Sequence, residues 1–278
     1  MHHTLHFLDD PLYDVEFYHS RVTNDRARAW PPHVHDGLEI YVLEKGAVSF
    51  EIERKKYTLA PGDAVFSRPG EIHNCILEKD GVHCHFCFWF DTPLFRRLAE
   101  LEGFAGERLI VLDAKAQTEL LCTCAAIEEA TLKEEKFLAF AATVRLLAIL
   151  GQRARNKKKD LPLRLAEILE DISDTTAELD AVAKAHFISP STLYRLFKDH
   201  LGLSPRAYRE EKRLEKAKEL LRKGESVADA ARGAGFVNCS SFIRTFRQRV
   251  GVTPAVYSRF ARDGSASRLY TDIRWLEE

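Results

Sequence analysis

The C-terminal half of the chain contains one helical pattern twice, at a constant offset of 49 residues. Residues 193–208 read LYRLFKDHLGLSPRAY and residues 242–257 read FIRTFRQRVGVTPAVY. The matched pairs include Arg195/Arg244, Phe197/Phe246, Lys198/Arg247, Gly202/Gly251, Pro205/Pro254 and Tyr208/Tyr257, and the same offset extends backwards to Phe187/Phe236 and Asp180/Asp229. A repeat of this length indicates one supersecondary unit used twice, which we interpret as two short helices joined by a turn.

Helix-start signals predict where the elements of each copy begin. A serine or threonine before proline marks a start, because its hydroxyl accepts from a free amide and proline suits the first turn. Such pairs occur at Ser189, Ser204 and Thr253, Asn238 is a further cap, and Thr175/Glu178 and Ser226/Asp229 match the capping box. The predicted helices are 176–185 and 190–201 in the first copy, 227–233 and 239–250 in the second, and 205–222 between them.

Charge divides the chain into two unlike parts. Residues 153–262 hold 23 lysines and arginines against 14 acidic residues, a net charge of +9, whereas residues 1–152 have a net charge of -8. A basic domain beside an acidic one indicates that nucleic acid contacts only one half. We expect domains at 1–152 and 162–262, a basic linker at 153–161 and a tail at 263–278. The tail should dock on the protein through Leu269, Ile273, Trp275 and Leu276.

The second helix of each copy predicts a DNA-reading surface. In a helix-turn-helix this helix lies in the major groove, where an arginine can bond O6 and N7 of one guanine. We assign base readout to Arg195 and Arg244, and phosphate contacts to Lys198 and Arg247. An ion pair with a carboxylate such as Glu211 is the alternative for the two arginines. The remaining predicted DNA-binding residues are Ser191, Thr192, Tyr194, Cys239, Ser240 and Ser241.

The segment 205–222 would separate the two reading helices. A helix of this length is about 27 Å long, close to one turn of DNA at about 34 Å. One subunit would then contact two successive major grooves.

Residues 161–260 resemble the DNA-binding domain of the AraC/XylS family of bacterial transcription regulators. The second copy, VADAARGAGFVNCSSFIRTFRQRVGVTPAVY, carries the most specific signature, with Gly235-Phe236, Phe242–Phe246 and Gly251–Pro254. The resemblance implies sequence-specific binding of promoter DNA, usually activation, RNA polymerase as a partner and no enzymatic activity. Where the family has Ile-Ala, this chain has Ala230-Ala231, so we expect a smaller core contact in the second copy.

Short apolar runs from about 30 to 90 predict an all-β unit, a sandwich or a barrel. The expected strands are 38–44, 47–53, 63–67, 73–78 and 82–90, followed by helices at 93–101, 114–130 and 134–152. The overall prediction is an α+β two-domain fold: a cupin-like β-barrel with appended helices, then an all-α domain with two helix-turn-helix units. The apolar residues of 114–152 exceed one stripe, so either a homodimer forms there or the helices pack within the chain.

Histidines and one glutamate follow the spacing of the two cupin motifs. His33, His35, Glu39 and His73 would ligate one divalent metal in a metallo-cupin, because imidazole with carboxylate suits first-row transition ions. The same residues could instead contact an organic effector or serve structure alone, and no cofactor is required. The predicted effector-binding set is His33, His35, Glu39, Tyr41, His73 and His85.

Strand parity extends this candidate lining. His83, His85, Cys87 and Trp89 share one strand face, and the phenylalanines on the opposite face are expected to pack. Trp30 and Tyr41 could stack on a ligand, although a lone aromatic usually belongs to a core.

The six cysteines lack a zinc-finger array, so we expect reduced thiols in a cytoplasmic protein. We also expect no signal peptide and no membrane span. Together these observations predict a transcription regulator that responds to a small-molecule effector. The alternatives are a metallo-cupin enzyme with an accessory DNA-binding domain and a sequence-blind architectural DNA binder.

Overall fold

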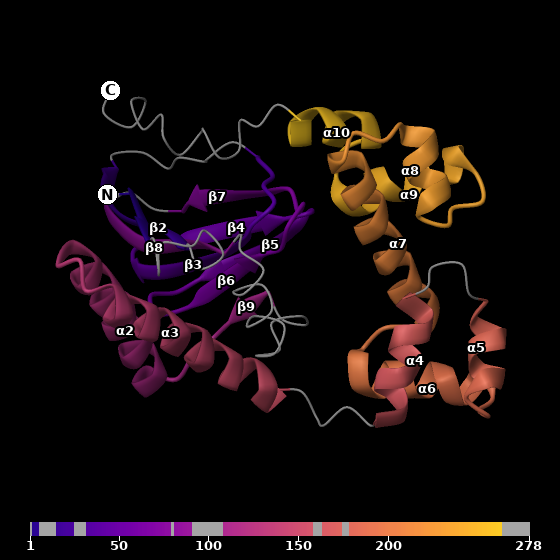
Figure 1. The fold of residues 1–278 in the computed structure, drawn as a ribbon, viewed down its shortest axis with the longest axis horizontal. Coiled ribbons are helices and arrows are strands. Elements are labelled where there is room, and N and C mark those ends of the chain that lie inside the picture. The colour runs from indigo at the N-terminus through magenta and orange to yellow at the C-terminus, as the bar shows by residue number, and fades with distance from the viewer. Residues whose placement is uncertain are drawn as a thin grey trace. The chain divides into compact units, whose positions relative to one another are not determined.

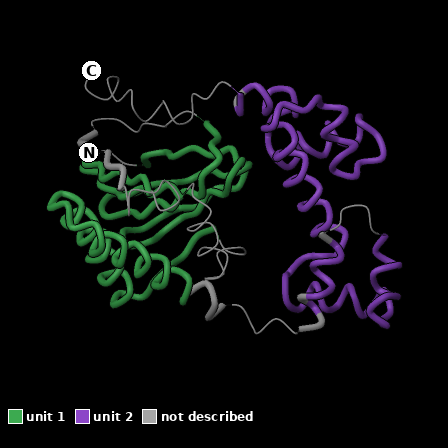
Figure 2. Tube along the Cα trace, viewed as in Figure 1, with its two compact units in different colours: residues 1–157 green, residues 158–278 purple. Residues whose placement is uncertain are grey.

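The chain divides into two compact units, residues 1–157 and 158–278, in the computed structural model (Figure 2). The structure describes residues 2–5, 15–24, 32–78, 81–90, 108–157, 163–173 and 178–262. The predicted helix 93–101, Trp30, Thr175 and the tail 263–278 lie outside these residues. Among the described helices, none combines the length and the apolar character needed to cross a bilayer.

Two antiparallel sheets form the first unit (Figure 1). The larger sheet has the strand order β1-β2-β8-β3-β6-β9, and the smaller has the order β5-β4-β7. The strands are β1 His2–Leu5, β2 Val15–Asn24, β3 Leu38–Lys45, β4 Val48–Ile52, β5 Lys55–Leu59, β6 Ala64–Ser67, β7 His73–Leu77, β8 Gly81–Phe90 and β9 Leu109–Ile110. The five predicted strands are present as β3, β4, β6, β7 and β8, whereas β1, β2, β5 and β9 were not predicted.

Strand β8 lies between β2 and β3 and divides its side chains between two environments. Phe86, Phe88 and Phe90 join the apolar core that also contains Leu120 of helix α2 (Ala114–Leu132) and Leu147 of helix α3 (Lys136–Lys157). The alternate residues of β8, with their register partners Tyr18 on β2 and Tyr41 on β3, face away from this helix-packed side of the sheet. This arrangement agrees with the predicted packing role of the aromatic face.

One domain boundary differs from the prediction. Helix α3 continues to Lys157, so residues 153–157 of the predicted linker are helical. Helical apolar spacing ends earlier than the helix because the basic run Arg153–Lys157 contains no large apolar residue. A mostly polar last turn can still continue the helix, because each added residue gains a backbone hydrogen bond.

In the second unit, the elements of residues 163–173 and 178–262 are all helices, and helix α7 (Pro205–Arg222) connects its two halves (Figure 1). The first half consists of α4 Leu163–Ser173, α5 Leu179–Ala185 and α6 Pro190–Leu201, and the second of α8 Val227–Gly233, α9 Cys239–Val250 and α10 Pro254–Arg262. Helices α6 to α9 have their predicted bounds. Ser189, Ser204, Ser226 and Asn238 each accept a backbone amide at a helix start.

Helix α5 begins three residues later than predicted. Its N-cap is Glu178, whose side chain forms no capping hydrogen bond, and the helix starts at Leu179 rather than at 176. The capping-box pattern therefore misplaced this start.

The constant repeat offset fails before the reading helices. The N-caps Glu178 and Ser226 differ by 48 positions, whereas the N-caps Ser189 and Asn238 differ by 49. The second turn therefore contains one extra residue. Phe187 corresponds to Gly235, since both adopt positive φ, +52° and +77°. The proposed pairs Phe187/Phe236 and Asp180/Asp229 are wrong by one position.

Candidate functional site

The reading helices α6 and α9 bury one face and expose the other. Leu193 and Phe197 of α6 are buried, as are Phe242 and Phe246 of α9. On α6 the exposed predicted residues are Ser191, Tyr194, Arg195 and Lys198. On α9 they are Ser240, Arg244 and Arg247, and Arg244 is the repeat partner of Arg195. Thr192, Cys239 and Ser241 are half-buried.

The guanidinium groups of the two reading helices are available for contact. In the part of the chain that the structure describes, no ion pair or side-chain hydrogen bond holds Arg195 or Arg244. The alternative of an ion pair with Glu211 is therefore absent among these residues. Lys198 Nζ lies 5.8 Å from the centre of the Tyr194 ring, a weak cation–π contact at an exposed site.

Hydroxyl groups at the helix starts already have protein partners. Ser191 and Thr192 lie within 2.8 Å and 2.9 Å of Ser189 Oγ, and the Ser241 hydroxyl donates to the carbonyl of Asn238. These contacts fix the first turn of each reading helix. The arginines one turn later are therefore better placed than the hydroxyls for new bonds to bases.

Contacts to α7 hold the second reading helix in place. Arg249 of α9 donates to Glu210 of α7 at 2.8 and 2.9 Å. Helix α8 approaches α7 so closely that a Cβ at Gly233 would lie 2.8 Å from Leu220 Cδ1. The small residues Ala230 and Ala231, both buried, fit this close approach.

Two exposed apolar residues were missed as candidates for DNA contact. Phe187 is 93% exposed in the turn before α6, and Val237 is 97% exposed in the turn before α9. Their place beside the reading helices follows from the turn structure, and the sequence carried no signal for their exposure.

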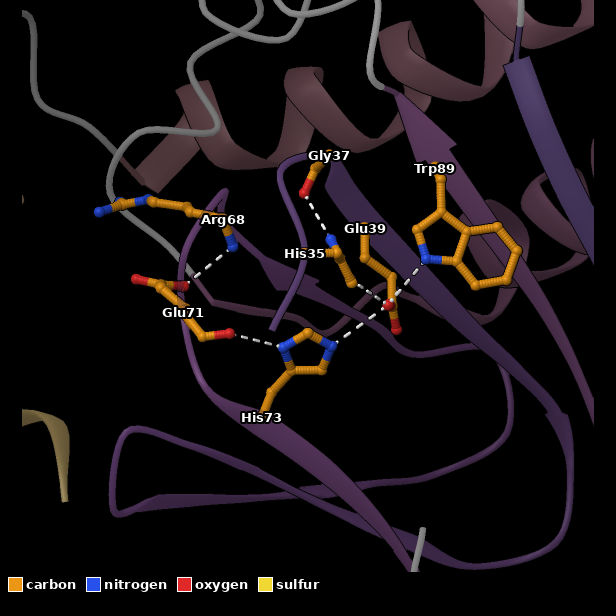
Figure 3. Close-up of polar contacts among 7 residues, drawn as sticks. All are labelled: His35, Gly37, Glu39, Arg68, Glu71, His73 and Trp89. Atoms are coloured by element: carbon orange, nitrogen blue, oxygen red, sulfur yellow. Dashed lines mark hydrogen bonds and ion pairs between the residues drawn. The ribbon is translucent and has the colours of Figure 1, made fainter. Parts of the chain in front are cut away.

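The first unit brings His33, His35, Glu39 and His73 together, and Figure 3 shows the last three of them. One ligand atom from each lies within 4.8 Å of the others. An antiparallel bridge joins the backbones of His33 and His73 through two hydrogen bonds of 3.0 Å. His73 begins β7 of the smaller sheet, and Glu39 lies on β3 of the larger sheet. The predicted four-residue set therefore forms one buried cluster.

Glu39 is the centre of the cluster. Its Oε2 lies 2.8 Å from His35 Nε2 and 3.2 Å from His73 Nε2, and it accepts a hydrogen bond of 3.0 Å from Trp89 Nε1. Burial by itself would raise the pKa of Glu39, but the charge of His73 and hydrogen bonds to both histidines hold that pKa well below its usual value. Burial would lower the pKa of His73, but Glu39 raises it.

Neighbouring loop residues orient the cluster. His35 Nδ1 lies 2.9 Å from the carbonyl oxygen of Gly37, and His73 Nδ1 lies 2.8 Å from that of Glu71 (Figure 3). The buried Glu71 carboxylate accepts from the Arg68 amide and pairs with Arg108. Trp89, which belonged to the predicted candidate lining, and Glu71, which was not predicted, both support the cluster.

A second polar group contains the other predicted effector residues, Tyr41 and His85. The ring of His85 stacks on Tyr41 with centroids 4.5 Å apart, and His83 Nε2 lies 2.7 Å from the Tyr41 hydroxyl. Burial lowers the pKa of His83 to about 4 and, with the charge of His83, lowers that of His85 well below its usual value. Both imidazoles are therefore neutral at pH 7.

The two units match two known domain families. The model of the AraC-like ligand binding domain matches residues 13–141, and the model of a helix-turn-helix domain matches residues 182–259. The HTH-type transcriptional activator RhaS of Enterobacter sp. (strain 638) is 28% identical over 238 residues, which cover 78% of this chain and 86% of that protein. RhaS of Escherichia fergusonii is 25% identical over 208 residues, covering 70% and 74%.

A solved structure with both units shares the fold. Wild-type ToxT from Vibrio cholerae, crystallised with unsaturated fatty acid, superposes with a TM-score of 0.50 at 13% identity. The match covers 90% of this chain and 96% of that one. The two domain models, in this order, and the paired helix-turn-helix units show that the chain belongs to the AraC/XylS family of transcriptional regulators.

Proposed function

We propose that this protein activates transcription by binding promoter DNA through both reading helices when a small molecule occupies the first unit. This proposal rests mainly on one observation: Arg195 and Arg244 are exposed at equivalent positions of α6 and α9. The curated relatives that it resembles are transcriptional activators. Helix α7, with 18 residues and a length of about 27 Å, suits the spacing of successive major grooves.

Each exposed side chain has a defined task in this proposal. Arg195 and Arg244 each bond one guanine, and Lys198 and Arg247 hold phosphates. The smaller residues contact the sugar-phosphate backbone or the base edges near the helix starts; they are Ser191, Thr192, Tyr194, Cys239, Ser240 and Ser241.

The effector binds on the side of the larger sheet that faces away from α2 and α3. Tyr41, His73 and His85 supply aromatic faces and hydrogen-bonding groups there. This polar and aromatic lining supports a polar effector. A divalent ion at the four-residue cluster is a separate feature of the same unit.

A homodimer through 114–152 and contact with RNA polymerase complete the proposal. Leu132, Phe137 and Leu138 expose 60–75% of their area around the turn between α2 and α3. A second copy would cover this apolar surface. Analytical ultracentrifugation of the wild type and of Phe137→Ser tests this. The wild type should sediment as a dimer, and the variant should dissociate into monomers at a higher protein concentration than the wild type. A monomeric wild type would refute the dimer.

DNA binding tests the main proposal directly. The operator is found by sequencing the genomic fragments that the purified full-length protein retains. Arg195→Ala and Arg244→Ala should each relax the preference at one base pair, at a cost of about 1–3 kcal/mol. Lys198→Ala should weaken all sequences and reduce the salt slope by about one.

Arg54→Ala is the matched control, because it removes an exposed arginine from the turn between β4 and β5, in the other unit and outside the proposed dimer surface. It should leave DNA affinity and base preference unchanged. Equal loss of affinity on all sequences in Arg244→Ala would instead support the architectural binder. Turnover of a small molecule that is lost in His73→Ala would support the metallo-cupin enzyme.

Regulation follows from coupling between the two units. If the effector favours the DNA-bound arrangement, operator DNA must raise effector affinity by the same factor that the effector raises DNA affinity. Equal effector affinity with and without operator would refute this coupling.

A further inference from the structure

The turns before the two reading helices each expose one apolar side chain. Phe187, in the turn before α6, is 93% exposed, and Val237, in the turn before α9, is 97% exposed. Their neighbours pack on the protein: Ile188 lies against the core of the first half, and the Phe236 ring lies 4.9 Å from that of Phe242. The exposure is therefore specific to these two residues and is not a general property of the turns.

Two different local structures produce this exposure. Phe187 has φ +52°, a left-handed conformation that is unfavourable for a residue with a Cβ, and its counterpart Gly235 has φ +77°. Since Ile188 and Phe236 are the packed residues that follow, Val237 is the extra residue of the second turn. A single exposed apolar residue is common on protein surfaces. The same result from a strained residue in one copy and an inserted residue in the other indicates a shared role.

Both side chains lie next to the caps that start the reading helices. Phe187 comes two residues before the cap Ser189, and Val237 comes directly before the cap Asn238. The N-terminal part of a reading helix is the part that contacts base edges in the major groove. An apolar group at this end of the helix is therefore positioned to reach the groove.

The major groove offers one apolar group. Each base edge there presents hydrogen-bond donors or acceptors, and only thymine adds a methyl group, at C5. The phosphates that border the groove attract cations and hydrogen-bond donors, and neither a phenyl ring nor an isopropyl group supplies these. The chemistry of the two exposed side chains therefore matches thymine.

We infer that Phe187 and Val237 each contact the C5-methyl group of a thymine and extend base readout beyond Arg195 and Arg244. The inference rests on the proposed function, since it requires both reading helices to lie in the major groove. It adds a second base to the sequence that each helix-turn-helix unit recognises.

The helix length gives the expected spacing of the two bases. The cap and the arginine of each reading helix are six residues apart, Ser189 and Arg195 in α6 and Asn238 and Arg244 in α9. Six residues correspond to about 9 Å of helix, and base pairs are about 3.4 Å apart. Each thymine should therefore lie roughly three base pairs from the guanine that the arginine of the same helix contacts.

A protein partner such as RNA polymerase is the competing explanation. An exposed apolar surface that binds protein is usually one continuous patch. Phe187 and Val237 belong to different halves of the second unit, which the 18-residue helix α7 connects. What the two residues share is their position before a reading helix, and that position favours DNA.

Replacing thymidine by deoxyuridine in the operator tests the inference, because the two nucleosides differ only in the C5-methyl group. The operator is the one identified from the retained genomic fragments, and those fragments should share a thymine at each expected position. Each thymine is replaced in turn, and the affinity of the full-length protein is measured by fluorescence anisotropy. Removing the methyl group at either expected position should weaken binding about three- to fivefold.

Variants of the two residues serve as controls for each other. Phe187→Gly suits the positive φ and should lose the response to the methyl group in the half-site of α6, while keeping the response in the half-site of α9. Val237→Ser should do the reverse. Val111→Ser removes an apolar residue that is 48% exposed in the first unit, and it should keep both responses. Far-UV circular dichroism verifies that each variant is folded.

The inference is wrong if the retained fragments share no thymine at these positions, or if the wild type binds the thymine and deoxyuridine operators equally. An equal loss of affinity by Phe187→Gly on both operators would also overturn it and would indicate a contact with the sugar-phosphate backbone. So would a variant that keeps the full methyl response and loses only transcription by RNA polymerase in vitro.

All of these results leave the proposed function intact, because that function depends on the base preference that Arg195 and Arg244 confer. The absence of that preference would instead refute the proposed function.

Discussion

The turn before α6 should become more stable when Phe187 is replaced by glycine. Phe187 has φ +52°, in the left-handed region that costs a residue with a Cβ about 1–2 kcal/mol. Glycine removes this strain but loses about 0.4–1 kcal/mol through the greater freedom of the unfolded chain. Since the phenylalanine side chain is 93% exposed, little apolar burial is lost. The expected net gain is about 0.5–1 kcal/mol.

Urea unfolding of the full-length protein measures this change. Circular dichroism at 222 nm reports the helices of both units, including α2 and α3 of the first. In a Trp275→Phe background, fluorescence follows only Trp30 and Trp89 in residues 1–157. In that background Phe187→Gly should shift the part of the circular dichroism transition that belongs to the second unit to higher urea, and it should leave the fluorescence transition unchanged.

Two further variants test the physical reason. Phe187→Ala keeps the positive φ and removes only the ring, so its stability should stay within about 0.5 kcal/mol of the wild type. Gly235→Ala places a Cβ at the equivalent position of the second copy, φ +77°, and should cost about 1 kcal/mol. Destabilisation by Phe187→Gly, or no effect of Gly235→Ala, would refute the assignment of these two positions as equivalents.

Other variants follow from the packing, the caps and the buried histidines. Phe246→Ala should destabilise the second unit by about 3–5 kcal/mol, because Phe246 is fully buried between Phe242 and Tyr257; its urea midpoint measures this loss. Asn238→Ala should cost about 1 kcal/mol by removing the cap of α9, while Asn238→Ser should restore most of it. Burial lowers the pKa of His83 to about 4, so only the unfolded chain binds a proton between about 4 and 6.5, and stability falls as the pH is lowered through that range. His83→Gln should therefore flatten the loss of stability between pH 7 and pH 5, as measured by fluorescence-detected unfolding.

Local signals predicted the second unit well where a cap and an apolar stripe agreed. Helices α6 to α9 have their predicted bounds because Ser189, Ser204, Ser226 and Asn238 mark the starts and Gly202 and Gly251 follow two of the ends. Helix α4 was missed although its buried residues Leu165, Ile168 and Ile172 have helical spacing. The prediction placed these residues in the domain 162–262 but named no helix among them.

Tertiary context decided the elements that local signals did not show. Strand β2 contains Glu16, His19 and Arg21, and its role depends on pairing along nearly all of β8. The extra residue before α9 also has no local signal, because a constant offset fits the reading helices themselves. Only the caps on both sides of each turn revealed it.

The spacing of the histidines predicted which four residues meet, because strand and loop lengths fix where a short motif folds back. The supporting residues could not be predicted in the same way. Trp89 reaches Glu39 through the pairing of β8 with β3, and Arg108 reaches Glu71 from 37 positions away.

Strand β8 carries two sets of side chains on one backbone. His83 and His85 belong to the polar group proposed to meet the effector, and the residues between and after them, Cys84, Phe86 and Phe88, point to the opposite face, where Phe86 and Phe88 support the layer of α2 and α3. A ligand that shifts the β8 backbone at either histidine also moves the adjoining phenylalanines, since both faces of the strand share one backbone. Binding of the effector between the two sheets would then move β8, and β8 would move the helices α2 and α3 that pack on its other face.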